Sequence, residues 1–372
     1  MLAAEMSDRT LRIALVEPYL GGSHRAWAEG YQRHSVHDVE VFGLPAINWK
    51  WRMQGGHVTL APRIGAAVAE RGPFDVVVAS SMTDLAGLLG VARRPLAGAR
   101  TVLFVHENQL TFPRPPHDHD LTYAMTNWTS MVAADLVVFN SEFHRSEWFA
   151  ALPGFLGRLP DHRHTRLVDD VAERSIVLPV GADLRGLDRV PRERGARSLV
   201  LWNQRWEYDK GPVEFAEVVE GLADDDVELE VALAGQRPGD EPPELAGLRT
   251  SLGDRLVHDG HADLATYRRL LRRADVVVST ARHEFFGIAV TEAVYAGAFP
   301  ILPNRLVYPE RIPAEHHGAC LYGTGAELTE RLRWAVTHRA EADAVATALR
   351  PAMARCDWAQ VAPRYDAAFA DR

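Results

Sequence analysis

Residues 274–304, ADVVVSTARHEFFGIAVTEAVYAGAFPILPN, constrain the fold of this chain more than any other stretch. The apolar, β-branched run from Asp275 to Ser279 is typical of a buried parallel strand. Phe286 and Gly287 then open a helical pattern, which Gly297 ends ahead of Pro300. The stretch therefore predicts a strand, loop, helix, strand unit, the building block of a parallel α/β sheet.

The loop of this unit predicts a site for an anion that carries hydroxyl groups on both sides. Free backbone N–H groups in the first turn of a helix favour a phosphate at the carboxyl edge of a parallel sheet. Glu284 precedes the helix, and Glu292 lies roughly 7.5 Å further along its axis. Carboxylates accept hydrogen bonds from sugar hydroxyls but repel phosphate. A nucleotide sugar, with a diphosphate between two sugars, fits this arrangement.

A pair of cations follows another predicted strand of the second half, Ser198 to Asn203. Arg205 lies just beyond the strand, and Lys210 precedes Gly211 at the start of the next helix. Two cations at this edge can clamp a diphosphate and offset the charge that develops on it as a leaving group. The pair therefore predicts the same ligand as the two glutamates.

The composition is that of an ordinary globular protein. The chain has 372 residues, 47% hydrophobic and 24% charged, which is enough for two domains of roughly 150 to 190 residues each. The N-terminal MLAAEMSDRT has acidic residues and no apolar run of signal-peptide length, and no segment approaches the roughly 20 apolar residues of a membrane span. We expect a cytoplasmic protein without membrane insertion. Cys320 and Cys356, without CxxC spacing, favour core thiols over a disulfide or a zinc site.

The charge distribution bears on the partners of the chain. The formal net charge is −9, which excludes a surface that is basic throughout but allows a local basic groove. Residues 1–185 carry 18 basic and 20 acidic residues, whereas the rest carries 23 and 30. Any nucleic acid is therefore expected on the first half.

The first half predicts a Rossmann-like repeat of strands and helices. Its first strand ends at Glu17-Pro18, and Gly21, Gly22 and Ser23 lead into a helix. Glycines let a phosphate or sugar approach the backbone, and Ser23 can cap the helix; a plain tight turn is the alternative. The predicted strands are Leu11–Val16, Val39–Leu44, Phe74–Ser80, Thr101–His106, Leu136–Asn140 and Ser175–Val180 here, and Ser198–Asn203, Val227–Ala234, Arg255–His258 and Asp275–Ser279 in the second half.

Polar residues directly after the fourth strand mark a candidate site for chemistry. His106 and Asn108 lie there, at the carboxyl edge of the predicted sheet. The run His117-Asp118-His119-Asp120 follows. Alternating residues of this kind in a loop form a solvated turn more often than a metal site, so we expect no metal.

Two further segments of the first half are candidates for binding a nucleic acid. Trp49, Lys50, Trp51 and Arg52 form a predicted loop that suits stacking on a base beside a phosphate, with packing against a neighbouring helix as the alternative. The stretch from Phe155 to Arg166 holds one acid among several cations, which suits a phosphate backbone but also a solvated loop. Its arginines are Arg158, Arg163 and Arg166.

The motifs of the second half resemble a known family. Glu284 and Glu292, with seven residues between them in the context EFFGIAVTEAVYAGAFPI, are similar to the E-x7-E signature of retaining family 4 glycosyltransferases. The spacing of Arg205 and Lys210-Gly211 resembles the R-x4-KG element of the same family. The first half narrows the resemblance. EPYLGGSHRAWAEGY, WKWRMQGG and FVHENQLTFP are similar to the tRNA-queuosine α-mannosyltransferase family.

The resemblance implies a fold and an activity. The fold is α/β of the GT-B type, two facing Rossmann-like domains with a deep interdomain cleft. The implied activity is retaining transfer of mannose from GDP-mannose to queuosine in an aspartate tRNA, with no other cofactor and no metal. It implies an acceptor-side domain at residues 1–185, a nucleotide-sugar domain at 186–352 and, at 353–372, a helix over about Trp358–Ala370 that crosses back to the first domain.

The resemblance also implies roles for single residues. Arg205, Lys210 and the amides after Phe286 hold the diphosphate, Glu292 the ribose, and Glu284 the transferred sugar. His106 orients the sugar or the acceptor hydroxyl. No catalytic base is expected, because the departing phosphate takes the acceptor proton in this family.

Other functions remain open on the sequence. They are a family 4 glycosyltransferase with a glycan, lipid or small-molecule acceptor, a GT-B sugar-nucleotide epimerase or phosphorylase, and a non-catalytic protein that binds RNA or a nucleotide sugar. Release of free nucleotide only after an acceptor is added distinguishes a transferase from the last two.

Overall fold

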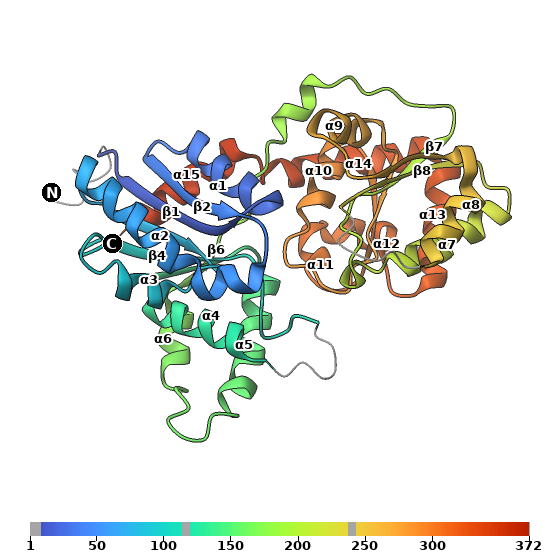
Figure 1. Ribbon diagram of the computed structural model, residues 1–372. Coiled ribbons are helices and arrows are strands. Elements are labelled where there is room, and N and C mark those ends of the chain that lie inside the picture. Colours follow the sequence, from blue (N-terminus) through green and yellow to red (C-terminus); the bar gives the residue numbers. More distant parts are fainter. Residues whose placement is uncertain (1–8, 114–119, 237–242, 372) are drawn as a thin grey trace. The chain divides into compact units, whose positions relative to one another are not determined.

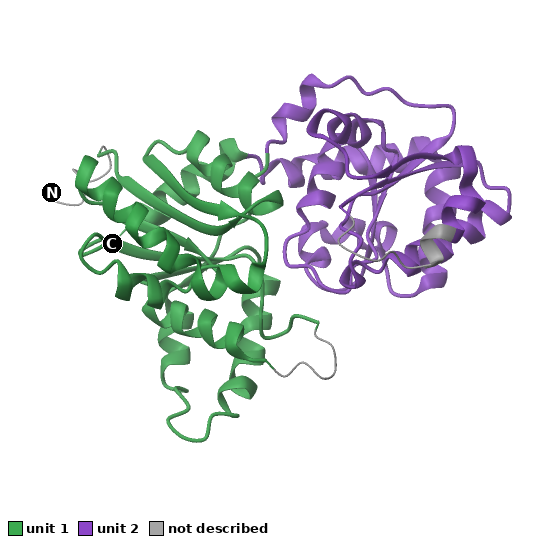
Figure 2. Ribbon diagram, in the orientation of Figure 1, with its two compact units in different colours: residues 1–182, 358–372 green, residues 183–357 purple. Residues whose placement is uncertain are grey.

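The structure is a computed structural model that describes residues 9–113, 120–236 and 243–371. The chain divides into two compact units, shown in different colours in Figure 2. Unit 1 comprises residues 1–182 and 358–372, and unit 2 comprises residues 183–357. The two units are described separately below.

Unit 1 contains a parallel sheet of six strands in the order β2-β1-β3-β4-β5-β6, with helices on its faces (Figure 1). The order reverses between β1 and β3, and in open α/β sheets ligands bind beyond the carboxyl ends of the strands at such a point. The elements are β1 (Arg12–Leu20), α1 (Gly22–His34), β2 (Asp38–Pro45), α2 (Trp49–Arg71), β3 (Val76–Ser80), α3 (Leu85–Val91), β4 (Arg100–Val105), α4 (Thr122–Ala133), β5 (Leu136–Phe139), α5 (Glu142–Leu156), α6 (Leu167–Glu173), β6 (Ser175–Val177) and α15 (Trp358–Ala370).

The core of unit 1 lies between its sheet and the covering helices. Inward-facing strand residues such as Val77 and Leu103 pack with Trp128 and Met131 of α4, all of them fully buried. Near-continuous apolar strands of this kind are what a parallel sheet with helices on both faces requires.

The last helix, α15, belongs to unit 1 although the whole of unit 2 precedes it in the chain. The Tyr31 hydroxyl of α1 donates a hydrogen bond to Asp366 at 2.9 Å, and Arg100 donates to the backbone oxygens of Ala368 and Phe369. The side chains of Trp358, Val361, Tyr365 and Phe369 are buried, so the stripe that the sequence shows on this helix faces the interior.

Three local predictions for unit 1 were wrong. Strand β1 does not end at Glu17-Pro18 but continues to Leu20, because an irregularity in its pairing with β2 accommodates the proline. Ser23 caps no helix, because α1 begins at Gly22 and Gly21 occupies the N-cap position. The Trp49–Arg52 segment is not a loop, because α2 begins at Trp49, directly after Asn48 in a left-handed conformation.

Unit 2 contains a second parallel sheet, in the order β12-β11-β10-β7-β8-β9. The order reverses between β7 and β10, which places the ligand position of this sheet there. The elements are η1 (Arg185–Arg189), β7 (Ser198–Trp202), η2 (Tyr208–Lys210), α7 (Pro212–Asp224), β8 (Leu229–Ala234), α8 (Pro243–Leu252), η3 (Gly253–Arg255), β9 (Leu256–Gly260), α9 (Leu264–Arg273), β10 (Val276–Val278), α10 (Ile288–Ala296), β11 (Phe299–Pro303), α11 (Tyr308–Arg311), η4 (Ala314–His316), α12 (His317–Cys320), β12 (Leu321–Tyr322), α13 (Gly325–Thr337) and α14 (Arg339–Ala354).

The strand, loop, helix, strand unit at 274–304 is confirmed. It consists of β10, α10 and β11, with Gly287 at the N-cap of α10 and Gly297, at φ +108°, at its C-cap. The side chains of Cys320 and Cys356 are buried in the interior of unit 2, as expected. The short strand β12 was not predicted, since two residues carry too little pattern to be recognised.

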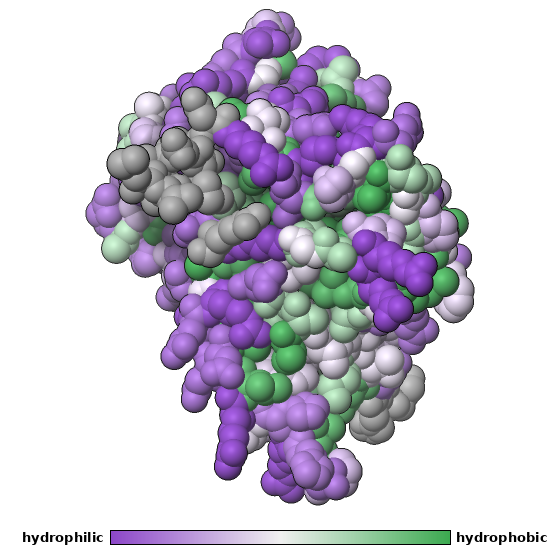
Figure 3. Space-filling view, turned by 90° about the vertical axis from the view of Figure 1, so that its left-hand side faces the viewer, coloured by the Kyte–Doolittle hydropathy of each residue, from purple (hydrophilic) through white to green (hydrophobic). Residues whose placement is uncertain are grey.

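The molecular surface mixes hydrophilic and hydrophobic residues. On the face drawn in Figure 3 the hydrophobic residues are bordered by hydrophilic ones. In the described parts of the chain, every helix is too short or too polar to span a bilayer.

Candidate functional site

The cations predicted in the second half lie at the switch point of the unit 2 sheet. Arg205 and Lys210 follow β7, and Glu284 follows the neighbouring strand β10. Gly211 brings the two loops together. At its φ of +63° a side chain is strained, and a Cβ there would lie 2.4 Å from the backbone oxygen of Thr280.

Lys210 links the two strand ends. Its ammonium group donates to the backbone oxygen of His283 at 2.7 Å and to Glu284 Oε2 at 3.4 Å, and it lies 3.2 Å from Asp209 Oδ2. The side chain is 12% exposed. A cation that is this enclosed by carboxylates holds its position before any ligand arrives, which is the requirement for electrostatic preorganisation.

Glu284 is held as an anion. Burial opposes its ionisation, but the Lys210 ammonium and the N–H groups of Gly287 and Phe286 outweigh burial and lower the pKa of Glu284 to about 2. Glu284 Oε1 accepts hydrogen bonds from the N–H groups of Phe285, Phe286 and Gly287 at 3.0 to 3.2 Å. Two of the predicted phosphate-binding positions, Phe286 and Gly287, therefore donate to a carboxylate in this structure.

Arg205 is more exposed to solvent than Lys210. Its side chain is 50% exposed, with one guanidinium nitrogen 3.2 Å from Glu207 Oε2. An ion pair between a half-exposed guanidinium and a partly exposed carboxylate contributes little, so the Arg205 side chain can exchange Glu207 for a ligand at a lower cost than the enclosed Lys210.

Glu292 belongs to a hydrogen-bond chain that the sequence did not reveal. The Tyr267 hydroxyl of α9 donates to Glu292 Oε2 at 2.8 Å and accepts from Asn203 Nδ2 at 3.1 Å. Burial, which outweighs the hydrogen bond from Tyr267, raises the pKa of Glu292 to about 7. Near neutral pH this carboxyl group therefore exchanges between its charged and neutral forms, and it can both accept from and donate to a hydroxyl-bearing ligand.

A second hydrogen-bond chain lies beyond the carboxyl ends of β7 and β10. Gln204 Nε2 donates to Ser279 Oγ at 2.7 Å, and Ser279 Oγ lies 2.6 Å from the Tyr308 hydroxyl. Gln204 follows β7, Ser279 follows β10 and Tyr308 begins α11, so these buried groups fix the strand ends relative to one another.

In unit 1 the predicted glycine turn lies at the carboxyl end of β1. Gly21 is extended, and Gly22 has φ +52°. Gly22 and Ser23 are exposed at the start of α1. The structure places these residues at the switch point of this sheet, and their part in binding a sugar or phosphate stays a prediction.

His106 lies at the end of β4, between aromatic rings. Its ring centroid is 4.5 Å from that of His24 and 4.5 Å from that of Trp27. The backbone N–H of His106 donates to Ser81 Oγ, and its backbone oxygen accepts from Asn140 Nδ2. Burial, followed by the nearby rings of His24 and His144, lowers the pKa of His106 well below 6.5. His106 is therefore neutral at physiological pH.

Asn108 is fully buried two residues further along. Its Oδ1 accepts from the N–H groups of Leu110 and Thr111, and its Nδ2 has no hydrogen-bond partner among the described residues. Asn127 of α4 is also fully buried, and its Oδ1 likewise has no hydrogen-bond partner among the described residues. Buried amide atoms without partners are rare in native proteins and commonly mark a place for water or a ligand.

The tryptophans of the predicted stacking segment have different environments. Trp49 packs against Tyr123 with ring centroids 5.1 Å apart, as the packing alternative expects, and Lys50 lies over both rings. Trp51 is 61% exposed. Arg52 donates to the backbone oxygen of Pro45. Of this segment, Trp51 is the residue most available for a partner.

The predicted basic cluster forms an exposed loop between α5 and α6. Figure 1 shows this loop projecting beyond the ends of both helices. Arg158, Arg163 and Arg166 are all exposed there, and Arg163 donates only to the backbone oxygen of Leu159 among the hydrogen bonds that the structure gives for it. Of the predicted HDHD run, His117, Asp118 and His119 lie outside the described residues.

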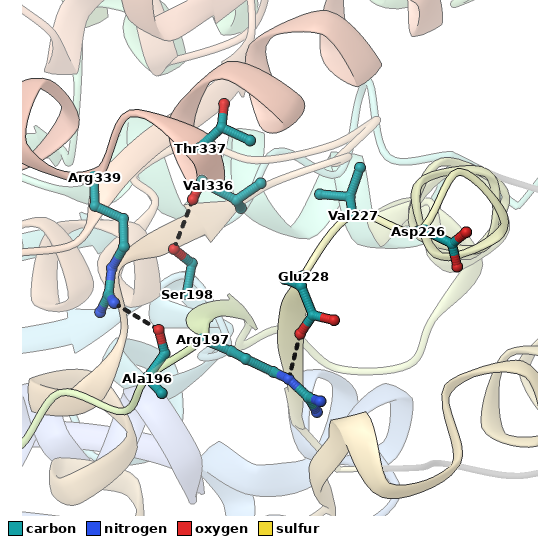
Figure 4. A pocket seen from close by; sticks show the side chains of 9 residues that line it. All are labelled: Ala196, Arg197, Ser198, Asp226, Val227, Glu228, Val336, Thr337 and Arg339. Atoms are coloured by element: carbon teal, nitrogen blue, oxygen red, sulfur yellow. Dashed lines mark hydrogen bonds and ion pairs between the residues drawn. The ribbon is translucent and has the colours of Figure 1, made fainter.

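A cavity of about 450 Å³ lies elsewhere in unit 2, at the amino ends of β7 and β8 (Figure 4). Several of its polar groups bind one another. Arg197 pairs with Glu228, Ser198 donates to the backbone oxygen of Val336, and Arg339 donates to the backbone oxygen of Ala196. The cavity is at the opposite strand ends from the predicted site, and both of its arginines already have partners.

Comparison with known families accounts for most of the chain. Residues 12–182 match the family described as tRNA-queuosine alpha-mannosyltransferase N-terminal, and residues 187–349 match glycosyl transferases group 1. A tRNA-queuosine alpha-mannosyltransferase from Drosophila melanogaster is 34% identical over 88% of this chain and 87% of its own length. A GDP-mannose:cellobiosyl-diphosphopolyprenol alpha-mannosyltransferase from Xanthomonas campestris is 28% identical over 46% of this chain and 47% of its own.

Similar solved structures confirm the predicted GT-B fold. Sucrose-phosphate synthase from Thermosynechococcus elongatus matches with a TM-score of 0.70 and 16% identity, over 96% of this chain and 97% of that chain. Anabaena HepE, solved in complex with UDP, matches with a TM-score of 0.66 and 17% identity, over 95% of this chain and 98% of that chain. At these identities the likeness concerns the fold alone.

Proposed function

The chain belongs to the tRNA-queuosine alpha-mannosyltransferase family and is a hexosyltransferase, and from this premise we propose that it transfers mannose from GDP-mannose to queuosine in tRNA. The observation that carries the proposal is the 34% identity to the Drosophila enzyme over 88% of the chain, which includes the N-terminal family match. The relatives that act on a polyprenol-linked acceptor cover less than half of the chain. A tRNA acceptor is therefore better supported than a lipid.

The donor is proposed to bind at the carboxyl edge of unit 2. Lys210 and Arg205 would bind the diphosphate and offset the charge on the departing GDP, Glu292 the ribose hydroxyls, and Glu284 the hydroxyls of the mannose. Glu284 suits this role because its low pKa keeps it an acceptor at every physiological pH. Tyr267 and Asn203 would orient Glu292 through the hydrogen bonds described above.

Transfer with retention is proposed to proceed without a protein nucleophile and without a metal. The acceptor hydroxyl would attack from the face of the leaving phosphate, and the phosphate would take its proton. The role of the protein is then to stabilise the departing diphosphate by fixed charges, a contribution that mutagenesis of other enzymes puts at about 10² to 10³-fold per group.

The acceptor is proposed to bind on unit 1. The exposed arginines at 158, 163 and 166 would contact tRNA phosphates, and the exposed ring of Trp51 would stack on a base. A tRNA substrate would place the enzyme in the cytoplasm, as the sequence led us to expect.

The proposal is tested by incubating the full chain with GDP-mannose and queuosine-containing aspartate tRNA, then digesting the tRNA and analysing the nucleosides by mass spectrometry. We expect one added hexose on queuosine and release of GDP in equal amount. The matched control is the same tRNA with guanosine in place of queuosine, which should stay unmodified. Hexose transfer to both tRNAs, or to neither, contradicts the proposal.

A further inference from the structure

Three side chains converge at the switch point of unit 1. Glu17 comes from β1, His24 from α1 and His106 from the end of β4. One carboxylate oxygen and one ring nitrogen from each histidine all lie within 4.8 Å of one another. In the sequence, Glu17 indicates only the end of a strand, and no local pattern predicts a role for His24.

Glu17 fixes the orientation of His24. The Glu17 side chain is fully buried, and its two oxygens accept from the N–H of Tyr19 at 2.9 Å and from His24 Nδ1 at 2.8 Å. A buried carboxylate contributes little net stability, but it selects the tautomer of the histidine that it contacts. With the proton on Nδ1, the Nε2 atom of a neutral His24 carries a lone pair.

His106 faces His24 and has an unused polar atom. Its Nε2 is buried and has no hydrogen-bond partner among the described residues. Leaving a ring nitrogen in this condition costs free energy that a bound hydroxyl group would recover. The fully buried amides of Asn108 and Asn127, each with an atom that lacks a described partner, belong to the loop after the same strand and to α4.

The chemistry of the cluster favours a neutral ligand with adjacent hydroxyl groups. The buried carboxylate of Glu17 repels an anion such as phosphate, and the His106 ring, whose pKa is well below 6.5, carries no charge that would offset this repulsion. A metal ion at this cluster would prefer Glu17 as a ligand. Both oxygens of Glu17 already accept N–H groups, so Glu17 orients the ring of His24 rather than offering a free oxygen to a metal. A hydroxyl group can donate to one imidazole nitrogen and accept from another.

Queuosine, the proposed acceptor, carries a cyclopentenediol ring with two adjacent hydroxyl groups. We propose that His24 and His106 bind these two hydroxyl groups, and that Glu17 is the positioning residue for His24. The inference rests on the proposed function, since it takes queuosine as the acceptor, and it adds His24 as a substrate-contacting residue.

The test uses the full chain with GDP-mannose and queuosine-containing tRNA. His24→Ala removes one binding group. Glu17→Gln keeps the shape of the side chain but allows the amide to donate to His24 Nδ1, which moves the ring proton to Nε2. We expect each variant to raise the KM for the tRNA by about tenfold, to leave the KM for GDP-mannose unchanged, and to weaken competitive inhibition by free queuosine to the same extent.

The matched control is His34→Ala, which removes a histidine from the other end of α1, where it stacks on Trp358. This variant should keep the wild-type KM for tRNA. If His24→Ala does not fold, His24→Asn keeps a polar group of smaller size and carries the same expectation.

The outcomes separate the inference from the function on which it rests. Hexose transfer by the wild type, with an unchanged tRNA KM in the His24 and Glu17 variants, overturns the inference alone. Failure of the wild type to modify queuosine tRNA overturns the proposed function and this inference with it. One equivalent of bound metal in the wild type, absent from His24→Ala, assigns the cluster to a metal centre and also overturns the hydroxyl-binding role.

Discussion

Both sheets of this protein are parallel and six-stranded, each with one reversal of strand order, but they carry different chemistry at their carboxyl edges. In unit 2 the switch point holds a fixed ammonium group, Lys210, between two carboxylates, with the half-exposed guanidinium of Arg205 beside it. In unit 1 the corresponding position holds neutral His106 and buried asparagine amides around one buried carboxylate.

The difference shows how one fold can bind two kinds of ligand. Charged groups that are preorganised at a strand edge suit a diphosphate, whereas neutral imidazoles and amides suit hydroxyl groups. We therefore propose a division of roles, in which unit 2 recognises the donor by charge and unit 1 recognises the acceptor by neutral hydrogen bonding at the strand ends and by the basic loop between α5 and α6.

The largest expected effect comes from removing the fixed cation of unit 2. Lys210→Ala should lower the transfer rate by about 10²-fold or more and weaken GDP binding, because a preorganised charge is lost. It also leaves Glu284 without its ammonium partner. Steady-state kinetics and calorimetric titration with GDP measure both effects.

The matched control for Lys210 is Arg197→Ala. Arg197 also pairs with a glutamate, but at the opposite strand ends of the same sheet. It should leave both GDP binding and the transfer rate at their wild-type values. Equal losses in the two variants would mean that general charge, rather than the position of Lys210, explains the result.

The two glutamates of unit 2 should have opposite effects on stability. Unfolded Glu292 ionises near pH 4.5 and folded Glu292 near 7, so its contribution to the free energy of unfolding falls as the pH rises through this window. Glu284 has a folded pKa of about 2, so its contribution is lost as the pH falls from 4.5 towards 2.

Denaturant unfolding at several pH values measures this contrast. Relative to the wild type, Glu292→Gln should gain stability between pH 5 and 8, and Glu284→Gln should lose stability above pH 5. Glu292→Gln should also weaken GDP-mannose binding by about tenfold, since a ribose partner is altered. A pH-independent difference for both variants would refute the assignment of these pKa values.

A smaller effect is expected from the basic loop of unit 1. Arg163→Ala with Arg166→Ala should flatten the dependence of the tRNA KM on salt, because each phosphate contact contributes about 0.7 to 0.9 to the log–log slope. Donor binding should not change. Arg93→Ala with Arg94→Ala removes two arginines of unit 1 outside this loop and serves as the control. A wild-type salt slope in the Arg163 and Arg166 variant would exclude this loop as the RNA contact.

The smallest effect is expected from chelation. Transfer should continue at its normal rate in EDTA, since the proposed roles of Lys210 and Arg205 replace those of a divalent ion. Loss of activity in EDTA and its recovery with a divalent ion would contradict this expectation and direct attention to the Glu17, His24 and His106 cluster.

The proposed donor site at the carboxyl edge of the unit 2 sheet was largely predictable, because short stretches of sequence indicate its strands and its helix. The β-branched run, Gly287, Gly297 and Pro300 fix the bounds of β10, α10 and β11 without any knowledge of distant residues. Its supporting residues were not predictable. Asn203, Tyr267 and Glu292 are far apart in the chain, and only the folded sheet brings them into one hydrogen-bond chain.

The acceptor edge shows where local signals mislead. Glu17 follows an apolar run and precedes a proline, which indicates the end of a strand, but β1 continues and buries the carboxylate against His24. Trp49 and Trp51 look alike in sequence, and whether each is packed or exposed depends on the distant Tyr123. A sequence without its folded neighbours cannot distinguish these cases.

Hydrogen–deuterium exchange of the full chain tests the division of roles most directly. GDP alone should slow exchange at residues 204–211 and 284–292 of unit 2 and leave residues 106–108 of unit 1 unchanged. Queuosine-containing tRNA alone should protect residues 106–108 and 158–166 and leave the unit 2 segments unchanged. Protection of residues 106–108 by GDP, or of residues 284–292 by tRNA alone, would contradict the account.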